Sequence, residues 1–148
     1  MFYSYMTDYN VHYCANNLNN KGCKSIDDKI VTYNGLKIAG LGGCQSHNPD
    51  GVYQLSEEQM DVRVNKLLRE SKGEIDIFVS HAPALGLGDG SDFFHKGFAC
   101  FINVLDSAKP KLHVFGHQHL SYGSKHKNPI QYNDTLLYNA FGYTIVDV

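Results

Sequence analysis

The sequence predicts an α/β fold in which a mixed sheet with β-hairpins is flanked by helices. Three observations predict this class. Short apolar runs typical of strands alternate with two stretches whose apolar residues recur at helical spacing. Two pairs of strand-like runs are each joined by a two-residue turn, and two other runs end in histidines. An order of strand, helix, strand, helix, strand and final hairpin implies a mostly parallel sheet with antiparallel additions.

The first strands are predicted to form a hairpin. Lys29–Tyr33 and Leu36–Leu41 alternate apolar and polar residues, and Asn34-Gly35 stands between them. Asn and Gly adopt the left-handed backbone that a two-residue hairpin turn needs. The Asn-rich residues 8–24 before this hairpin are predicted to be a loop.

A helix is predicted to begin after Ser56 and to reach Ser71. Ser56 and Gln59, three residues later, form a capping-box sequence, and Lys72-Gly73 ends the pattern. The apolar residues at helical spacing are expected to face the core. They are Met60, Val64, Leu67 and Leu68. Residues 44–55, before the helix, are predicted to be a loop.

Two further strands each end in a histidine. Residues 74–83 read as a strand that reaches His81, because Pro83 removes a donor and stops the strand. Residues 112–119 read as a strand whose Gly116 lets the backbone turn sharply before His117.

Between these two strands lie a loop and a helix. Residues 85–96 are dense in Gly and Asp and are predicted to be a loop. A helix is expected over residues 97–108, and Pro110 closes it. After the second strand, residues 130–140 read as a hairpin that turns at Asn133-Asp134, and residues 143–148 as a terminal strand.

Length and composition indicate one globular domain over residues 1–148. Charged residues make up 19% and hydrophobic ones 43% of the chain, which is typical of a folded protein. The formal charge of −2 indicates no clear nucleic-acid surface. No apolar run is long enough to span a membrane, and the N-terminus lacks the pattern of a signal peptide. A cytoplasmic location is therefore expected.

The four cysteines never form a C-x-x-C pair. In a chain with no export signal they are expected to be reduced thiols, and Cys100 to be small core filling.

Three histidines are the strongest functional signal in the sequence. His81 ends one strand of the inferred βαβ unit, and His117 and His119 end the next. Ligands in open α/β sheets bind beyond the carboxyl ends of the strands, and neutral imidazole is a common metal ligand. We therefore expect these three side chains to bind a metal ion. The other strand and loop histidines, His12, His47, His113 and His126, are interpreted as structural.

Ser80-His81-Ala82-Pro83 followed by Gly116-His117-Gln118-His119 resembles the last two motifs of the calcineurin-like metallophosphoesterases. The resemblance implies the C-terminal half of a metallophosphoesterase-type β-sandwich flanked by helices. It also implies hydrolysis of phosphate esters with divalent metal ions such as Mn, Fe, Zn or Ni. In that family His81 and His117 would ligate one metal and His119 the other.

The earlier motifs of that family are missing from the sequence. It contains no D-x-H and no G-N-H motif. Three histidines without a bridging carboxylate are expected to hold one metal rather than two. We therefore expect a partial, truncated domain that is incomplete on its own, with self-association or an N-terminal partner segment completing it. The alternative is a non-catalytic metal-binding or interaction module.

The loop before the second helix carries three further candidates. Gly88-Asp89-Gly90-Ser91-Asp92 matches the string G-D-x-x-D, but it follows the S-H-x-P motif instead of preceding it. Asp89 and Asp92 are therefore either ligands of substrate or metal, or acceptors of hydrogen bonds within the loop. His95 either contacts a phosphate or caps the following helix.

Overall fold

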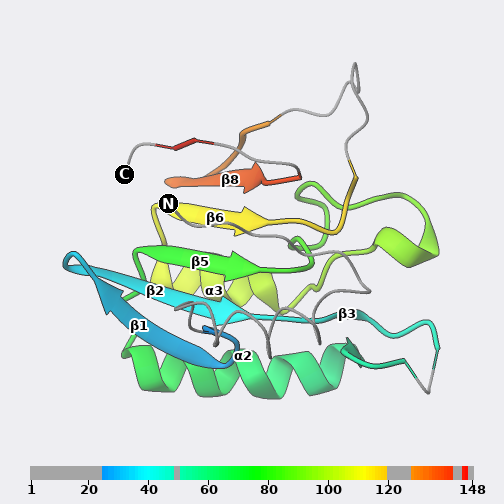
Figure 1. The fold of residues 1–148 in the computed structure, drawn as a ribbon, viewed down its shortest axis with the longest axis horizontal. Helices are drawn as coiled ribbons and strands as arrows, with labels where there is room; N and C mark the ends of the chain where they lie inside the picture. Colours follow the sequence, from blue (N-terminus) through cyan, green and yellow to red (C-terminus); the bar gives the residue numbers. More distant parts are fainter. Residues whose placement is uncertain (1–24, 49–50, 120–127, 142–144, 147–148) are drawn as a thin grey trace.

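The computed structural model describes residues 25–48, 51–119, 128–141 and 145–146. These residues form a six-stranded sheet in the order β1-β2-β5-β6-β8-β7, with helices α2 and α3 packed on one face (Figure 1). The predicted α/β class and its mixed sheet are confirmed. No helix in these ranges combines the length and the apolar character that crossing a bilayer requires.

The first hairpin is formed by β1 (Lys29–Tyr33) and β2 (Leu36–Leu41), as predicted. Tyr33 pairs with Leu36, so the loop between the strands has two residues. Asn34 and Gly35 both have positive φ, at 49° and 82°. Two successive positive φ values give a turn whose twist matches that of the strands, which is why Asn-Gly specifies this hairpin.

Helix α2 (Glu57–Ser71) begins and ends where the sequence predicts. The Ser56 hydroxyl accepts a hydrogen bond from the Gln59 N–H at 3.2 Å, and the Gln59 side chain accepts one from the Ser56 N–H at 2.8 Å. Lys72 then takes the left-handed conformation and ends the helix. Both ends are therefore set by local chemistry.

Parallel pairing joins the four central strands. β2 pairs in parallel with β5 (Ile77–Ser80), β5 with β6 (Leu112–Phe115), and β6 with β8 (Thr135–Asn139). Their carboxyl ends therefore lie at the same end of the sheet (Figure 1). The loops that follow β5 and β6 at this end carry His81 and His117.

The last predicted hairpin is present, with β7 (Ile130–Tyr132) antiparallel to β8 and Asn133 at a φ of 49° in the turn. The predicted terminal strand over residues 143–148 is tested only at Ile145 and Val146, which lie in no strand; its other residues lie outside the described ranges. The predicted loop over residues 8–24 also lies outside them.

The second helix begins later than predicted. Helix α3 (Phe101–Ala108) begins at Phe101 instead of residue 97. The Phe98 N–H donates to the Pro83 carbonyl at 3.0 Å, and the Leu85 N–H donates to the Phe98 carbonyl at 3.1 Å. These bonds hold residue 98 in extended pairing with the segment after β5, so the helix starts only beyond it.

The predicted loop over residues 44–55 contains a short ribbon. β3 (Cys44–Gln45) pairs with β4 (Gln54–Leu55), each strand having two residues. The Gln45 side chain donates to the Gly97 carbonyl at 2.8 Å, which ties this ribbon to the segment before α3. Two-residue strands leave too little periodicity in a sequence to be predicted.

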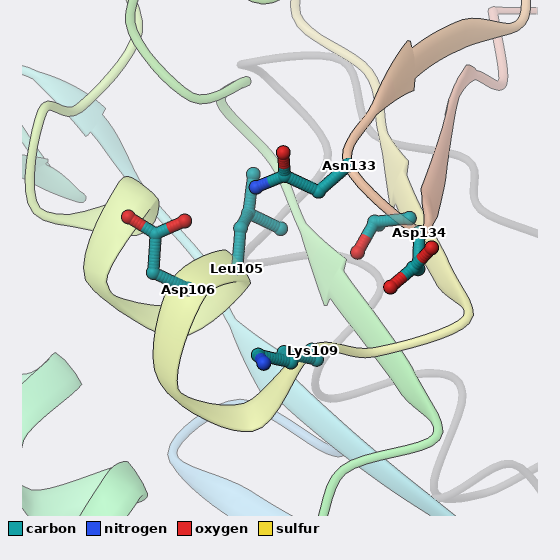
Figure 2. Close-up of a pocket in the computed structure, with 6 residues that line it drawn as sticks. Leu105, Asp106, Lys109, Asn133 and Asp134 are labelled. Atoms are coloured by element: carbon teal, nitrogen blue, oxygen red, sulfur yellow. The ribbon is translucent and has the colours of Figure 1, made fainter.

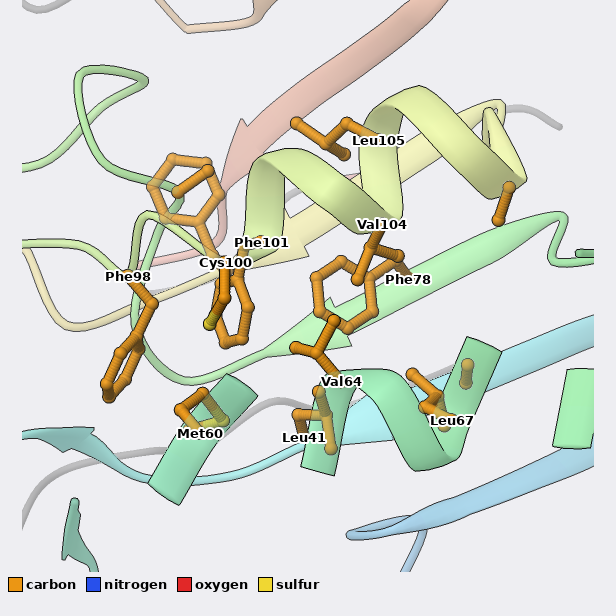
Figure 3. Packing of buried hydrophobic residues seen from close by; sticks show 14 of the residues in the cluster. Leu41, Met60, Val64, Leu67, Phe78, Phe98, Cys100, Phe101, Val104 and Leu105 are labelled. Carbon is orange, nitrogen blue, oxygen red and sulfur yellow. The ribbon is translucent and has the colours of Figure 1, made fainter. Parts of the chain in front are cut away.

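The core lies between the sheet and the two helices (Figure 3). Phe78 of β5 packs edge-to-face on Phe101 of α3, with ring centroids 5.2 Å apart. The predicted core face of α2 is confirmed, since Met60, Val64 and Leu67 are buried in the same cluster. Cys100 is buried there too, and burial raises the pKa of its thiol.

One polar side chain of the core is His113 on β6. It is fully buried, stacks on Phe78 and contacts the rings of Phe101 and Phe115. Its Nε2 lies 2.8 Å from the Ser80 hydroxyl, which itself donates to the Ala82 carbonyl at 2.6 Å. Burial lowers the pKa of His113 to about 3, so the ring is neutral in the folded chain. The structural interpretation of His113 is confirmed.

We expect Gly97→Ala to destabilise the fold and Gly116→Ala to be tolerated. A Cβ on Gly97 would lie 2.5 Å from the Pro83 carbonyl oxygen, whereas one on Gly116 would have no neighbour closer than 3.9 Å. Urea unfolding should therefore show a loss of about 2 kcal/mol for the first variant and a change within about 1 kcal/mol for the second. Equal effects would contradict this packing.

We also expect His113 to make stability depend on pH. The unfolded ring takes up a proton below its ordinary pKa of 6.5, but the folded ring does not until about pH 3. Stability contributed in this way is complete above about pH 6.5 and is lost as the pH falls, by about 2 kcal/mol between pH 7 and pH 5. Urea unfolding of wild type and His113→Gln across this range measures the difference. Parallel pH profiles would show that His113 is not the cause.

Candidate metal centre

His81 and His117 are brought together by the pairing of β5 with β6. Backbone hydrogen bonding between the two chain segments continues past the ends of both strands: the Gly116 N–H donates to the His81 carbonyl at 3.0 Å. On the other side, the His81 N–H donates to the Leu41 carbonyl of β2 at 3.3 Å. The two histidines are therefore held by the sheet, although 36 residues separate them along the chain.

The two rings face each other through nitrogen atoms. His81 Nε2 lies 3.0 Å from His117 Nδ1, and the side chains are buried, with exposed fractions of 3% and 7%. Two nitrogen ligands of one tetrahedral zinc ion lie about 3.3 Å apart, given Zn–N distances of about 2.0–2.1 Å. The pair therefore has nearly the separation that one metal ion requires.

The turn after β6 is centred on His117. His117 has a φ of 65°, which is unusual for a residue with a side chain, and the Gln118 N–H donates to the Gly116 carbonyl at 2.7 Å. The sequence predicted that Gly116 would provide the turn, and this is wrong in detail. The hydrogen bond from the Gln118 N–H to the Gly116 carbonyl closes a turn whose central residue, His117, takes the left-handed conformation. Backbone strain of this kind is typical of functional sites.

The second nitrogen of His117 is bonded to the loop before α3. His117 Nε2 lies 2.8 Å from the carbonyl oxygen of Phe94, in the short helix η1 (Phe93–His95). A carbonyl only accepts hydrogen bonds, so Nε2 carries the proton and Nδ1 has the lone pair. Metal-binding histidines commonly donate their other N–H to a carbonyl in this way.

His119 does not join this pair. It is exposed, and its ring stacks on that of Phe141 with centroids 4.7 Å apart. In the ranges that the structure covers, no three or more His, Cys, Asp or Glu side chains are grouped closely enough to hold a metal ion. The structure thus brings together two of the three predicted ligands, and the assignment of His119 stays a prediction.

Asp89 and Asp92 bind the backbone of their own loop. Asp89 accepts hydrogen bonds from the N–H groups of Gly86 and Gly97, at 2.8 and 3.2 Å. Asp92 accepts from Phe94 and His95, at 3.0 and 3.2 Å. These are the loop hydrogen bonds that the sequence left open as an alternative.

His95 lies beside the histidine pair. Its ring centroid is 5.4 Å from that of His117, and its Nδ1 lies 2.9 Å from both carboxylate oxygens of Asp92. The hydrogen bond from His95 lowers the pKa of the Asp92 carboxyl. A role of His95 in phosphate binding stays a prediction, and its contact with Asp92 belongs to η1 and not to a cap of α3.

Two residues that position the site were not identified from the sequence. Phe94 acts through its backbone carbonyl, for which no sequence pattern exists. Asn139, at the end of β8, donates to the Gln118 carbonyl at 2.9 Å and accepts from the Phe141 N–H at 2.9 Å. The sequence places this Asn at the end of the last strand of the predicted hairpin, which is a signal that could have indicated a polar contact there.

A cavity of about 400 Å³ lies at the other end of the sheet, between the end of α3 and the turn before β8 (Figure 2). Thr135 begins β8, whereas Asn139 ends it beside the histidine loop. The cavity is therefore separate from the histidine pair. Its lining residues are Leu105, Asp106, Lys109, Asn133, Asp134 and Thr135.

Comparisons with known proteins identify a relative of this chain. The chain is 32% identical over 107 residues to the UPF0046 protein C25E10.12 of Caenorhabditis elegans, a match that covers 68% of this chain and 36% of that protein. The chain thus spans about a third of the length of this curated relative.

Solved structures share the fold. One crystal structure superimposes with a TM-score of 0.57 at 15% identity, covering 81% of this chain and 46% of the other. That of TT1561 from Thermus thermophilus gives a TM-score of 0.56 at 12% identity, covering 89% of this chain and 56% of the other. The calcineurin-like phosphoesterase family matches residues 2–121, which confirms the resemblance drawn from the two motifs. This chain belongs to the calcineurin-like phosphoesterase family.

Proposed function

We propose that this chain carries the histidine side of a divalent-metal site that hydrolyses phosphate esters. The observation that supports it is the buried pair of His81 and His117, whose facing nitrogens lie 3.0 Å apart at the carboxyl ends of β5 and β6. Imidazole suits several metals, so Mn, Fe, Zn and Ni all remain candidates.

The chain's residues would hold the metal through His81 Nε2 and His117 Nδ1. The Phe94 carbonyl keeps the proton of His117 on Nε2, so that its Nδ1 lone pair faces His81. A bound divalent metal supplies positive charge that stabilises negative charge on a phosphoryl group. His95, whose ring is next to His117, is the side chain best placed to contact a phosphate ester.

We propose that the lone chain binds one metal and does not hydrolyse its substrate on its own. The sequence has no D-x-H or G-N-H motif, and both Asp89 and Asp92 accept hydrogen bonds from the backbone of their loop. Carboxylates that complete the site would come from an N-terminal partner segment or from another chain, so the domain is partial. The expected cytoplasmic location stays a prediction.

Metal binding tests the histidine pair first. We expect titration calorimetry with Zn²⁺ or Mn²⁺ to show one site per chain. His81→Ala and His117→Ala should each weaken binding at least about 10-fold, because each removes one of the nitrogens that face the metal. His12→Ala is a matched control, since the sequence assigns that histidine no metal role, and it should bind as wild type does.

The same titration tests His119. A loss of affinity in His119→Ala equal to that in His117→Ala would support the third predicted ligand. If the wild type binds no metal, or if neither His81→Ala nor His117→Ala changes the affinity, the proposed metal site is wrong.

Hydrolysis tests whether the site is incomplete. With Mn²⁺ and a generic aryl phosphate, we expect no turnover by the purified chain beyond that of the His117→Ala variant. Turnover that depends on His117 would contradict the proposal that the chain is incomplete. If a second chain bearing the D-x-H and G-N-H motifs restores no activity, the non-catalytic metal-binding module becomes the better interpretation.

Association with a second copy or a partner is also expected. β1 and β7 are the outer strands of the described sheet, and outer strands present backbone N–H and C=O groups that can pair with another chain. The apolar residues Ile38, Ile77 and Leu112, on the sheet face away from the helices, are buried, so this expectation rests on the strand edges. Light scattering should therefore detect dimers or larger species at micromolar concentration. A monodisperse monomer would contradict this expectation.

A further inference from the structure

The loop between β5 and α3 determines which ring nitrogen of His117 carries the proton and which one has a lone pair for a metal ion. The contact is made by a backbone carbonyl, that of Phe94, at 2.8 Å from His117 Nε2. The direction of this carbonyl depends on the conformation of η1, since no side-chain rotation can redirect it. Whatever holds η1 in place therefore acts on His117.

Asp92 holds η1 from its N-terminal side. It is the N-cap of η1, with an extended backbone, and its Oδ1 accepts hydrogen bonds from the N–H groups of Phe94 and His95 at 3.0 and 3.2 Å. The His95 ring adds a contact of 2.9 Å to each carboxylate oxygen. One carboxylate thus fixes both the backbone and the last side chain of η1.

The rest of the loop is anchored independently of Asp92. Asp89 binds the N–H groups of Gly86 and Gly97, on either side of η1. The Gly90 N–H also donates to the carbonyl of His95, the last residue of η1, at 2.8 Å. Loss of Asp92 should therefore loosen the N-terminal part of η1, which includes Phe94, without unfolding the loop.

We propose that Asp92 is a positioning residue that acts on His117 through the Phe94 carbonyl. By capping η1, Asp92 aims this carbonyl at His117 Nε2. The proton of His117 is thereby held on Nε2, and the Nδ1 that faces His81 keeps its lone pair. This inference rests on the proposed metal site for its consequence, but the tautomer itself is a property of the metal-free chain. It differs from the sequence-based assignment of Asp92 to substrate, because the contacts of its carboxylate are directed into the loop.

The backbone N–H groups of η1 need a hydrogen-bond acceptor but not a negative charge. Variants of Asp92 can therefore distinguish the effect of capping from the effect of charge. Asp92→Asn retains an acceptor oxygen and should behave as wild type does. Asp92→Ala removes it. Asp92→Gly also removes it but destabilises a cap less than Ala does, so it serves if the Ala variant folds poorly.

Two measurements on the full chain test the proposal. Long-range ¹H–¹⁵N NMR of the metal-free protein reports the tautomer of His117 directly. It should show the proton on Nε2 in wild type and Asp92→Asn, and a mixture of tautomers in Asp92→Ala and Asp92→Gly. Calorimetry with Zn²⁺ alone should show affinity reduced about 10- to 100-fold in the Ala and Gly variants and within about 3-fold of wild type in Asp92→Asn.

A matched control removes a carboxylate from elsewhere. Glu70→Ala on α2 takes away a half-exposed carboxylate with a weak contact to Lys66 at 3.9 Å, and it should leave both measurements unchanged. An unchanged tautomer in Asp92→Ala and Asp92→Gly would overturn the proposal, as would equal losses in Asp92→Asn and Asp92→Ala. If no variant binds zinc, the metal site fails, whereas the tautomer still tests the role of Asp92.

Discussion

The parallel pairing of β5 with β6 is the constraint on which the candidate site depends. It aligns Val79 with Val114, and the bond from the Gly116 N–H to the His81 carbonyl extends this alignment beyond the strands. Because side chains just beyond paired strands lie next to each other, His81 and His117 come together although they are far apart in the sequence. The apolar core between the sheet and helices α2 and α3 stabilises the sheet that holds the two histidines.

Burial of two imidazoles is costly unless their nitrogens find partners. Here the rings bond to each other and, through His117, to the carbonyl of Phe94. His117 also has a left-handed backbone, at a φ of 65°. His113, by contrast, lies among aromatic rings with a neutral side chain. Two buried histidine environments thus lie close together: one suits a ligand site and the other supports the core.

The sequence predicts most of the elements because local chemistry sets their ends. Asn34-Gly35 specifies the first hairpin, and Ser56 with Gln59 specifies the start of α2. The start of α3 could not be predicted, because residue 98 is held by bonds to Pro83 and Leu85, which are distant in sequence. The contact between the Phe94 carbonyl and His117 could not be predicted either, because it joins a backbone group to a residue distant in the sequence. The convergence of His81 and His117 could be predicted from strand order alone, whereas the position of His119 depends on a loop.

A crystal structure of the zinc-soaked protein, with anomalous data at the zinc edge, would show whether one metal ion binds between His81 Nε2 and His117 Nδ1. We expect a single strong peak about 2.0–2.1 Å from both nitrogens, with His117 Nε2 still bonded to the Phe94 carbonyl. A peak at other side chains, or at His117 Nε2 with the Phe94 contact broken, would contradict it.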